Sequence, residues 1–238
     1  MNKNILLLHG WGSNTQKLNS LKEELTNLGW RVYLPTLPGF DAPDPTEIWN
    51  NDNYVNYVLK ATRKFFKNKS FFVFGHSFGG GLAIKIALLN DKNIEGIVLC
   101  SAARVARKVN IFTKLFFNSI AKAGKVFLPV PFLGLFLRKV LYKAAGAHGF
   151  DKKSLVMQQT FKKVVSENLR SQVKIIKLPT LVLWGEKDKM TPIENAYFLN
   201  ESIKNSTLII FEDDGHKLPY DRPKEVAGEI QKWFSTLN

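Results

Sequence analysis

The sequence predicts an α/β protein with a doubly wound, mostly parallel sheet of about six strands and a helical insertion. Short apolar runs typical of strands alternate with helical segments over residues 1–103 and again over 175–238. Between them, residues 104–174 contain helical segments and no strand-like run. A glycine-rich turn at residues 75–80 joins one of the strands directly to a helix. Such alternation is typical of parallel sheets that carry helices on both faces.

Six buried strands are expected along the chain. They cover residues 4–8, 31–34, 70–74, 95–99, 180–184 and 207–211. Helices are expected at 17–28, 54–67, from the glycine-rich turn to about 90, and at 192–203 and 222–236. In the first helix, leucines at positions 18, 21, 25 and 28 recur at helical spacing, and Gly29 ends the helix.

The chain length and the cysteine content limit the class of protein. The 238 residues are enough for one α/β domain with an insertion. The single cysteine, Cys100, excludes an internal disulfide, and its place after an apolar run predicts a buried structural thiol. The N-terminal apolar run is too short for a secretion signal, and no run reaches the roughly 18 residues that a membrane span needs. These observations favour a cytoplasmic location.

The positive charge is concentrated in the insertion. The whole chain has a net charge of +14, and residues 104–174 hold 15 Lys and Arg residues against 2 Asp and Glu residues. In the stretch 111–127, apolar side chains share one helical face and lysines lie on another, so the segment is amphipathic. This asymmetry predicts a surface that meets an anionic partner. Nucleic acid is disfavoured as that partner, because no motif for binding it is present.

The turn at residues 75–80 has the sequence of a nucleophile elbow. Ser77 is flanked by Gly75 and Gly79, between a strand and a helix. The turn is so tight that side chains two residues before and after the serine would collide, so both positions need glycine. The serine hydroxyl is expected above the sheet edge, at a helix N-terminus that favours developing negative charge. The pattern G-x-S-x-G is weak alone, and the strand and helix around it strengthen it.

A candidate base and a candidate acid follow the serine. A serine nucleophile in an elbow is expected to be followed along the chain by Asp or Glu and then by His. Asp188 comes shortly after the fifth expected strand, and His216 comes shortly after the sixth. Both residues therefore lie with Ser77 at the carboxyl edge, where parallel sheets place their sites.

Other carboxylates compete with Asp188 for the role of the acid. The rivals are Glu186, Asp213 and Asp214. Glu186 is the strongest of them, because the other two are loop neighbours of His216 and have little reach to the far side of its ring. Asp188 itself could instead cap the turn before Pro192.

The first strand ends in the glycine-rich loop His9-Gly10-Trp11-Gly12, on the same edge of the sheet. Its glycines let backbone amides approach a ligand, so the oxyanion donors are assigned to the backbone N–H groups of Trp11 and Phe78. His9 is expected to hold its loop through side-chain hydrogen bonds. His76 is expected to pack beside the site, and His148 is expected on the surface.

Together these motifs resemble the α/β-hydrolase superfamily, and within it the small serine esterases and lipases with a helical cap. The resemblance is carried by residues 9–12, 75–80, 184–188 and 214–216, and it covers 1–103 and 175–238 as the core. It implies Ser77 as nucleophile, Asp188 as orienting acid and His216 as general base, with no metal or organic cofactor. Family members commonly have two more strands before the His-Gly loop, and these are expected to be absent here.

The resemblance also places a basic helical cap at residues 104–174. Its apolar face is expected to pack on the domain and line an acyl pocket, with four candidate lining residues: Phe112, Phe116, Phe132 and Phe136. Alternatively, the basic and apolar cap docks on an anionic lipid surface, which makes the protein peripheral to a membrane.

The predicted function is hydrolysis of carboxylic esters with an apolar acyl group, through an acyl-enzyme on Ser77. Hydrolysis of a carbon–carbon or peptide bond remains open, because relatives use the same triad for both. An alternative of a different class is a ligand sensor with little turnover. The sequence leaves the physiological substrate and the oligomeric state open.

Overall fold

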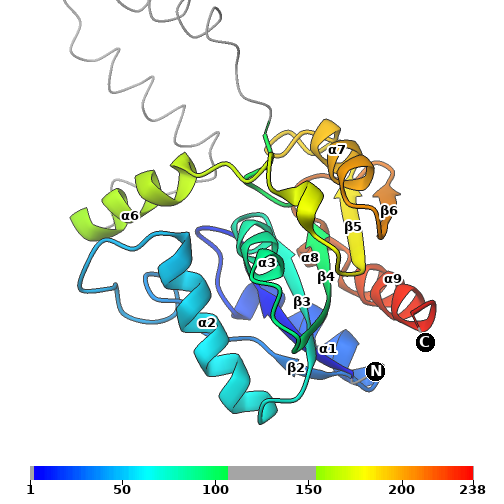
Figure 1. Cartoon of the computed structure of the whole chain (residues 1–238), viewed down its shortest axis with the longest axis horizontal. Coiled ribbons are helices and arrows are strands. Elements are labelled where there is room, and N and C mark those ends of the chain that lie inside the picture. Colours follow the sequence, from blue (N-terminus) through cyan, green and yellow to red (C-terminus); the bar gives the residue numbers. More distant parts are fainter. Residues whose placement is uncertain (1–2, 107–153, 238) are drawn as a thin grey trace, which may run out of the picture.

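A six-stranded parallel sheet forms the centre of the protein. The computed structural model describes residues 3–106 and 154–237. Within them, the strand order is β2-β1-β3-β4-β5-β6, and every neighbouring pair is parallel (Figure 1). The strands are β1 (Asn4–Leu8), β2 (Arg31–Tyr33), β3 (Phe71–His76), β4 (Ile94–Cys100), β5 (Thr180–Gly185) and β6 (Ser206–Phe211). The predicted fold class and all six predicted strands are confirmed.

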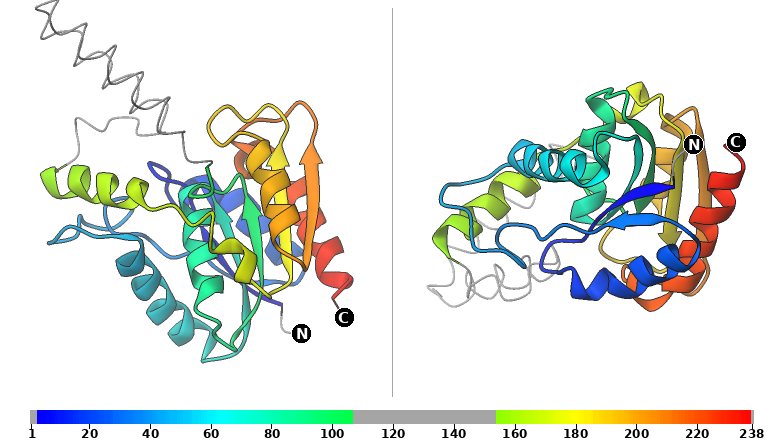
Figure 2. Two further views of the ribbon diagram at one scale, coloured as in Figure 1. Left: turned by 45° about the horizontal axis from the view of Figure 1, so that its top comes forward. Right: turned by 90° about the horizontal axis from the view of Figure 1, so that it is seen from below.

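Helices cover both faces of the sheet (Figure 2). One layer contains α2 (Asn51–Phe66), α3 (Phe78–Leu88) and α7 (Glu194–Ser202), and the other contains α1 (Asn19–Asn27), α8 (Leu218–Asp221) and α9 (Pro223–Ser235). Successive strand side chains point to opposite layers, because the side-chain period of a strand is two. Leu6 and Leu8 of β1 therefore join the first core, whereas Ile5 and Leu7 join the second.

Local capping explains where the helix bounds differ from the predicted ones. The second helix begins at Asn51 instead of residue 54, because the Asn50 side chain accepts a hydrogen bond from the Asn53 N–H and caps the helix there. The last predicted helix, at 222–236, corresponds to α9, which starts at Pro223; a proline suits a first turn because it has no N–H to satisfy. The short helix α8 comes just before it and was not predicted. Residues 16–18 form a 3₁₀ turn before α1.

The strand order fixes where a site can form. β1 lies between β2 and β3, so the chain leaves β1 in one direction across the sheet and continues from β3 in the other. Loops that follow the two strands at such a switch point open a crevice at the carboxyl edge. The His9–Gly12 loop after β1 therefore lies beside the turn that holds Ser77 after β3.

Part of the predicted insertion is visible beside this edge. The helix α6 (Leu155–Ser166) packs on the loop before α2, where the Thr160 Oγ1 accepts a hydrogen bond from the Trp49 N–H at 3.0 Å. The Phe161 ring of α6 lies 5.1 Å from the Trp11 ring, measured between centroids. A short 3₁₀ helix, η3 (Val173–Ile175), precedes β5.

Residues 107–153 lie outside the described part of the chain. They include His148 and the four candidate pocket residues, Phe112, Phe116, Phe132 and Phe136. The acyl pocket of the cap and the docking of the cap on lipid therefore stay predictions. Among the helices that the structure does describe, none is long and apolar enough to cross a bilayer.

Candidate active site

Ser77 lies in a strained turn between β3 and α3. Its backbone has φ 53° and ψ −112°, a conformation that residues with a side chain rarely adopt. A Cβ atom at Gly75 would lie 2.2 Å from the Gly79 carbonyl oxygen, and one at Gly79 would lie 2.2 Å from the Leu8 carbonyl oxygen. Both glycines are therefore required by close backbone approach, as expected of a nucleophile elbow.

The two predicted oxyanion donors come from two segments that line the same cavity as Ser77. Phe78 is the first residue of α3, and Trp11 belongs to the loop after β1. Neither backbone N–H has a hydrogen-bond acceptor among the described residues. Backbone donors without a partner suit an oxyanion, and the one at Phe78 also lies at a helix N-terminus. Their role remains a prediction.

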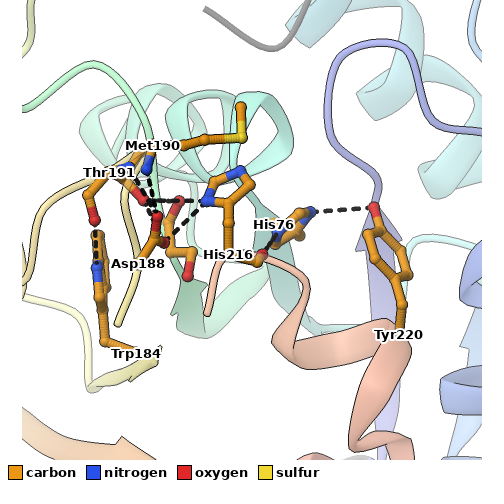
Figure 3. A network of polar contacts seen from close by, with 8 residues as sticks. His76, Trp184, Asp188, Met190, Thr191, His216 and Tyr220 are labelled. Carbon is orange, nitrogen blue, oxygen red and sulfur yellow. Dashed lines mark hydrogen bonds and ion pairs between the residues drawn. The ribbon is translucent and has the colours of Figure 1, made fainter. Parts of the chain in front are cut away.

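Asp188 and His216 form a direct pair in the loops after β5 and β6. The Asp188 Oδ2 lies 2.8 Å from the His216 Nδ1, and Thr191 donates its hydroxyl to the same oxygen at 2.7 Å (Figure 3). The Asp188 Oδ1 accepts the backbone N–H groups of Met190 and Thr191 at 2.8 and 2.9 Å. One oxygen thus holds the turn while the other faces the histidine, so the turn-capping role and the pairing role coexist.

The surroundings of Asp188 stabilise its charged form. The side chain is fully buried, and this burial alone would raise the pKa of its carboxyl. The His216 ring and the donors from Thr191 outweigh the burial and lower the pKa of Asp188 to about 2. Asp188 therefore carries its negative charge at neutral pH.

The rival carboxylates are directed elsewhere. Glu186 is exposed to solvent. Asp213 is also exposed and pairs with Lys187, and the Asp214 Oδ1 accepts a hydrogen bond from the Arg222 Nε at 3.3 Å. Of these four carboxylates, only Asp188 contacts the His216 ring in the described structure.

Ser77 and His216 line the same two cavities. No hydrogen bond joins the Ser77 Oγ to the His216 ring within the described residues, and the His216 Nε2 has no partner there. In enzymes without bound substrate, such bonds are often long and shorten when substrate binds. The Met190 side chain lies over the His216 ring in the view of Figure 3.

A second network holds the backbone of His216. The carbonyl oxygen of His216 accepts a hydrogen bond from the His76 Nε2 at 2.7 Å. The His76 Nδ1 is then the acceptor, and the Tyr220 hydroxyl lies 3.0 Å from it (Figure 3). The Tyr220 hydroxyl also lies 3.0 Å from the Ser13 Oγ, so the network joins the loops after β1, β3 and β6.

His76 stays neutral in the folded protein. Burial is the main cause that lowers the pKa of its imidazole to about 3, and the neighbouring His216 lowers it further. The neutral ring has one donor and one acceptor nitrogen, which is what the carbonyl of His216 and the hydroxyl of Tyr220 require. Burial also lowers the pKa of His9, whose Nδ1 donates to the Gly10 carbonyl at 2.9 Å.

Acid stability tests the state of His76. The unfolded chain protonates this residue below about pH 6.5, whereas the folded protein does so only near pH 3. The contribution of neutral His76 to the free energy of unfolding is therefore fully present above about pH 6.5. This contribution is lost as the pH falls from there toward pH 3, by at most about 1.4 kcal/mol per pH unit. The His76→Gln protein is expected to be less stable at neutral pH, but its urea midpoint should fall less steeply on acidification. Parallel pH profiles for the two proteins would contradict this assignment.

Two cavities meet at the candidate site. The larger, of about 490 Å³, is lined by the glycine-rich loop, Ser13, Lys17, His76, Lys217, Tyr220 and Asp221. The smaller, of about 190 Å³, is lined mostly by apolar side chains, among them Phe78, Phe161, Val165 and Pro192. Of the described residues, four belong to both linings: Trp11, Ser77, Met190 and His216. A substrate with one group on each side of its reacting atom would fit this arrangement.

Within the described ranges, no three His, Cys, Asp or Glu side chains are grouped closely enough to hold a metal ion. Cys100 is a free, fully buried thiol, as predicted, and burial raises its pKa well above the usual value. It is therefore a structural residue of the second core.

The parallel sheet, the elbow at Ser77 and the Asp188–His216 pair are typical of α/β hydrolases. Sequence comparison assigns the chain to the same class. The sequence signature described as "alpha/beta hydrolase fold" matches residues 3–223. The chain belongs to the α/β-hydrolase family.

The most similar relatives include named hydrolases. The chain is 28% identical over 254 residues to AB hydrolase superfamily protein YisY of Bacillus subtilis (strain 168), and the alignment covers 98% of this chain and 91% of that protein. It is 23% identical over 247 residues to Lipase 3 of Moraxella sp. (strain TA144), with 98% and 78% covered.

Solved structures show the same fold. An esterase from Exiguobacterium antarcticum superposes with a TM-score of 0.71 at 22% identity, over 97% of this chain and 91% of that one. The meta-cleavage product hydrolase from Pseudomonas fluorescens IP01 superposes with a TM-score of 0.69 at 20% identity, over 99% and 91%.

The structure adds residues that the sequence did not single out. Thr191 contacts both Asp188 and His216, and Tyr220 contacts His76. Thr191 could have been found, because an Asp followed three residues later by Thr is typical of a side-chain-held turn. Tyr220 has no such local signal, since its neighbours at the site come from distant segments.

Proposed function

We propose that this protein is a serine-dependent hydrolase of carboxylic esters. The observation that carries the proposal is the 2.8 Å contact between Asp188 and His216 at the meeting point of two cavities that Ser77 also lines. A buried carboxylate on one nitrogen of an imidazole, with the other nitrogen free beside a strained serine, is the arrangement that activates a hydroxyl.

The mechanism follows from these positions. The His216 Nε2 takes the hydroxyl proton as the Ser77 Oγ attacks the ester carbonyl, and Asp188 stabilises the imidazolium that forms. The backbone N–H groups of Trp11 and Phe78 stabilise the oxyanion. His216 then returns the proton to the leaving alcohol, and a water molecule activated by the same nitrogen hydrolyses the acyl-enzyme.

The two cavities suit the two halves of an ester. The smaller cavity, which is largely apolar, takes the acyl group, and the larger cavity, which exposes hydroxyl and charged groups, takes the alcohol. A volume of about 190 Å³ lies below the roughly 300–1,000 Å³ of sites for drug-sized ligands, so acyl groups of short to medium length fit best.

The test is a series of 4-nitrophenyl esters from acetate to decanoate. We expect many turnovers per protein molecule, with the highest kcat/KM at short to medium acyl length. Release of one product equivalent followed by arrest would instead support the ligand sensor. The 4-nitroanilides of the same acids test the peptide-bond alternative, which is favoured if the anilides are cleaved faster than the esters.

A further inference from the structure

Arg104 lines the smaller cavity together with Ser77, and its backbone conformation is unusual. It follows β4 and has a positive φ of 77°, which is unusual for a residue with a side chain. A Cβ atom at position 81 would lie 2.7 Å from the Arg104 Cγ, so Gly81 of α3 leaves the space that this side chain fills. The Arg104 carbonyl accepts the Leu169 N–H at 2.7 Å, which fixes the backbone. Strained residues held in this way are common at ligand clamps.

The guanidinium of Arg104 lacks a full set of partners. Its Nε is shielded from solvent and has no hydrogen-bond acceptor in residues 3–106 and 154–237. The charge of Glu167 acts on Arg104, but the described residues show no hydrogen bond between them. The two Glu167 carboxylate oxygens accept hydrogen bonds from Lys85 and from Asn51, each at 2.5 Å. A buried donor without an acceptor is unfavourable, and a ligand that supplies the acceptor removes this cost.

Arg104 remains charged at neutral pH. Burial lowers the pKa of its guanidinium to about 10, and the charge of Glu167 opposes this shift. An arginine with this pKa is still protonated in any physiological solution. The group is therefore a permanent cation and not a switch.

The cavity that Arg104 lines is the smaller one, which also contains Ser77 and His216. No Asp or Glu is among the described residues of that lining, and Arg104 is the one cation among them. Apart from Arg104, the polar groups available there include the Asn195 side chain, for which the described structure gives no hydrogen-bond partner. A negative group that enters this cavity thus meets a cation without a competing carboxylate.

We infer that Arg104 binds a carboxylate at the far end of the acyl group, so that the preferred substrates are monoesters of dicarboxylic acids. This inference rests on the proposed function, because it assumes that the smaller cavity holds the acyl side of an ester. A planar guanidinium pairs with a carboxylate through two parallel hydrogen bonds, which also fixes the distance between that carboxylate and the scissile carbonyl.

The test compares two esters of equal acyl length, mono-4-nitrophenyl adipate and 4-nitrophenyl hexanoate, after subtraction of the rates without enzyme. The measured quantity is the ratio of their kcat/KM values, which cancels any general loss of activity in a variant. In Arg104→Met, which keeps the apolar stem over Gly81, the adipate-to-hexanoate ratio should fall by about 10- to 100-fold. Arg104→Lys should keep part of the preference, since it retains the charge and loses the paired geometry.

The matched control is Arg63→Met. Arg63 pairs with Asp91 and lines neither cavity, so the ratio should stay at the wild-type value. If the ratio in Arg104→Met equals that of the wild type, or if the wild type shows no preference for the adipate ester, the inference is wrong while the proposed function stands.

A binding measurement decides the matter without turnover. Monomethyl adipate should raise the Tm of the Ser77→Ala protein more than methyl hexanoate does, and this difference should vanish when Arg104→Met is added. If neither ester is hydrolysed by the wild type, the proposed function fails, and the Tm difference alone then supports or overturns the binding of carboxylate by Arg104.

Discussion

Ser77→Ala is expected to lower kcat/KM for 4-nitrophenyl esters by about 10³-fold or more. The substitution removes the attacking oxygen and leaves the elbow intact, because alanine occupies the same backbone with a smaller side chain. The free energy of unfolding should therefore change little, and circular dichroism should match the wild type. Both rates are measured on one ester from the optimum of the series, at matched protein concentration.

A fluorophosphonate probe gives an independent measurement on the same protein. It should label the wild type once per chain and leave Ser77→Ala unlabelled. Ser235→Ala is the control, since Ser235 lies at the end of α9, far along the chain from the elbow, and lines neither cavity. Ester hydrolysis that survives in Ser77→Ala would falsify the assignment of the nucleophile.

Asp188→Asn is expected to lower kcat by about 10³- to 10⁴-fold. The Asp188 Oδ1 must remain an acceptor, because two backbone N–H groups point at it, so the new amide nitrogen must face His216. That nitrogen donates to the His216 Nδ1 and places the imidazole proton on Nε2, where it blocks acceptance of the Ser77 proton. The loss should appear in kcat more than in KM, because the cavities keep their shape.

Asp213→Asn is the matched control for the acid. Asp213 is close to His216 along the chain, but its carboxylate pairs with Lys187 in solvent. We expect its kcat to remain within about twofold of the wild type, since exposed ion pairs contribute little. A large loss in Asp213→Asn, with a small one in Asp188→Asn, would reverse the assignment of the acid.

The sheet and the elbow could be predicted because their signals are local. Each strand is a short apolar run bounded by turn residues, and Gly75 and Gly79 lie only two positions from Ser77. The place of Asp188 and His216 at the carboxyl edge of the sheet could also be predicted, because each residue comes shortly after an expected strand, β5 or β6. The helix bounds were less accurate, because a single cap such as Asn50 moves a helix end by several residues.

The remaining parts of the site depend on contacts between distant segments. The Tyr220 hydroxyl meets His76 across 144 positions of sequence, and the Thr160 hydroxyl meets the Trp49 N–H across 111. Arg104 becomes notable only when Gly81 is placed against its side chain. No periodicity or spacing in one sequence reports such contacts, since they arise when loops from different strands converge on one edge.

The backbone conformation at Ser77 favours glycine for stability, whereas the proposed activity requires serine. Its conformation costs about 1–3 kcal/mol for a residue with a side chain, and glycine would relieve that cost. The neighbouring positions Gly75, Gly79 and Gly80 already carry glycine. A population of variants selected only for resistance to heat should therefore accumulate Ser77→Gly, whereas one selected for hydrolysis should retain serine. Selection for stability and selection for hydrolysis thus favour different residues at position 77.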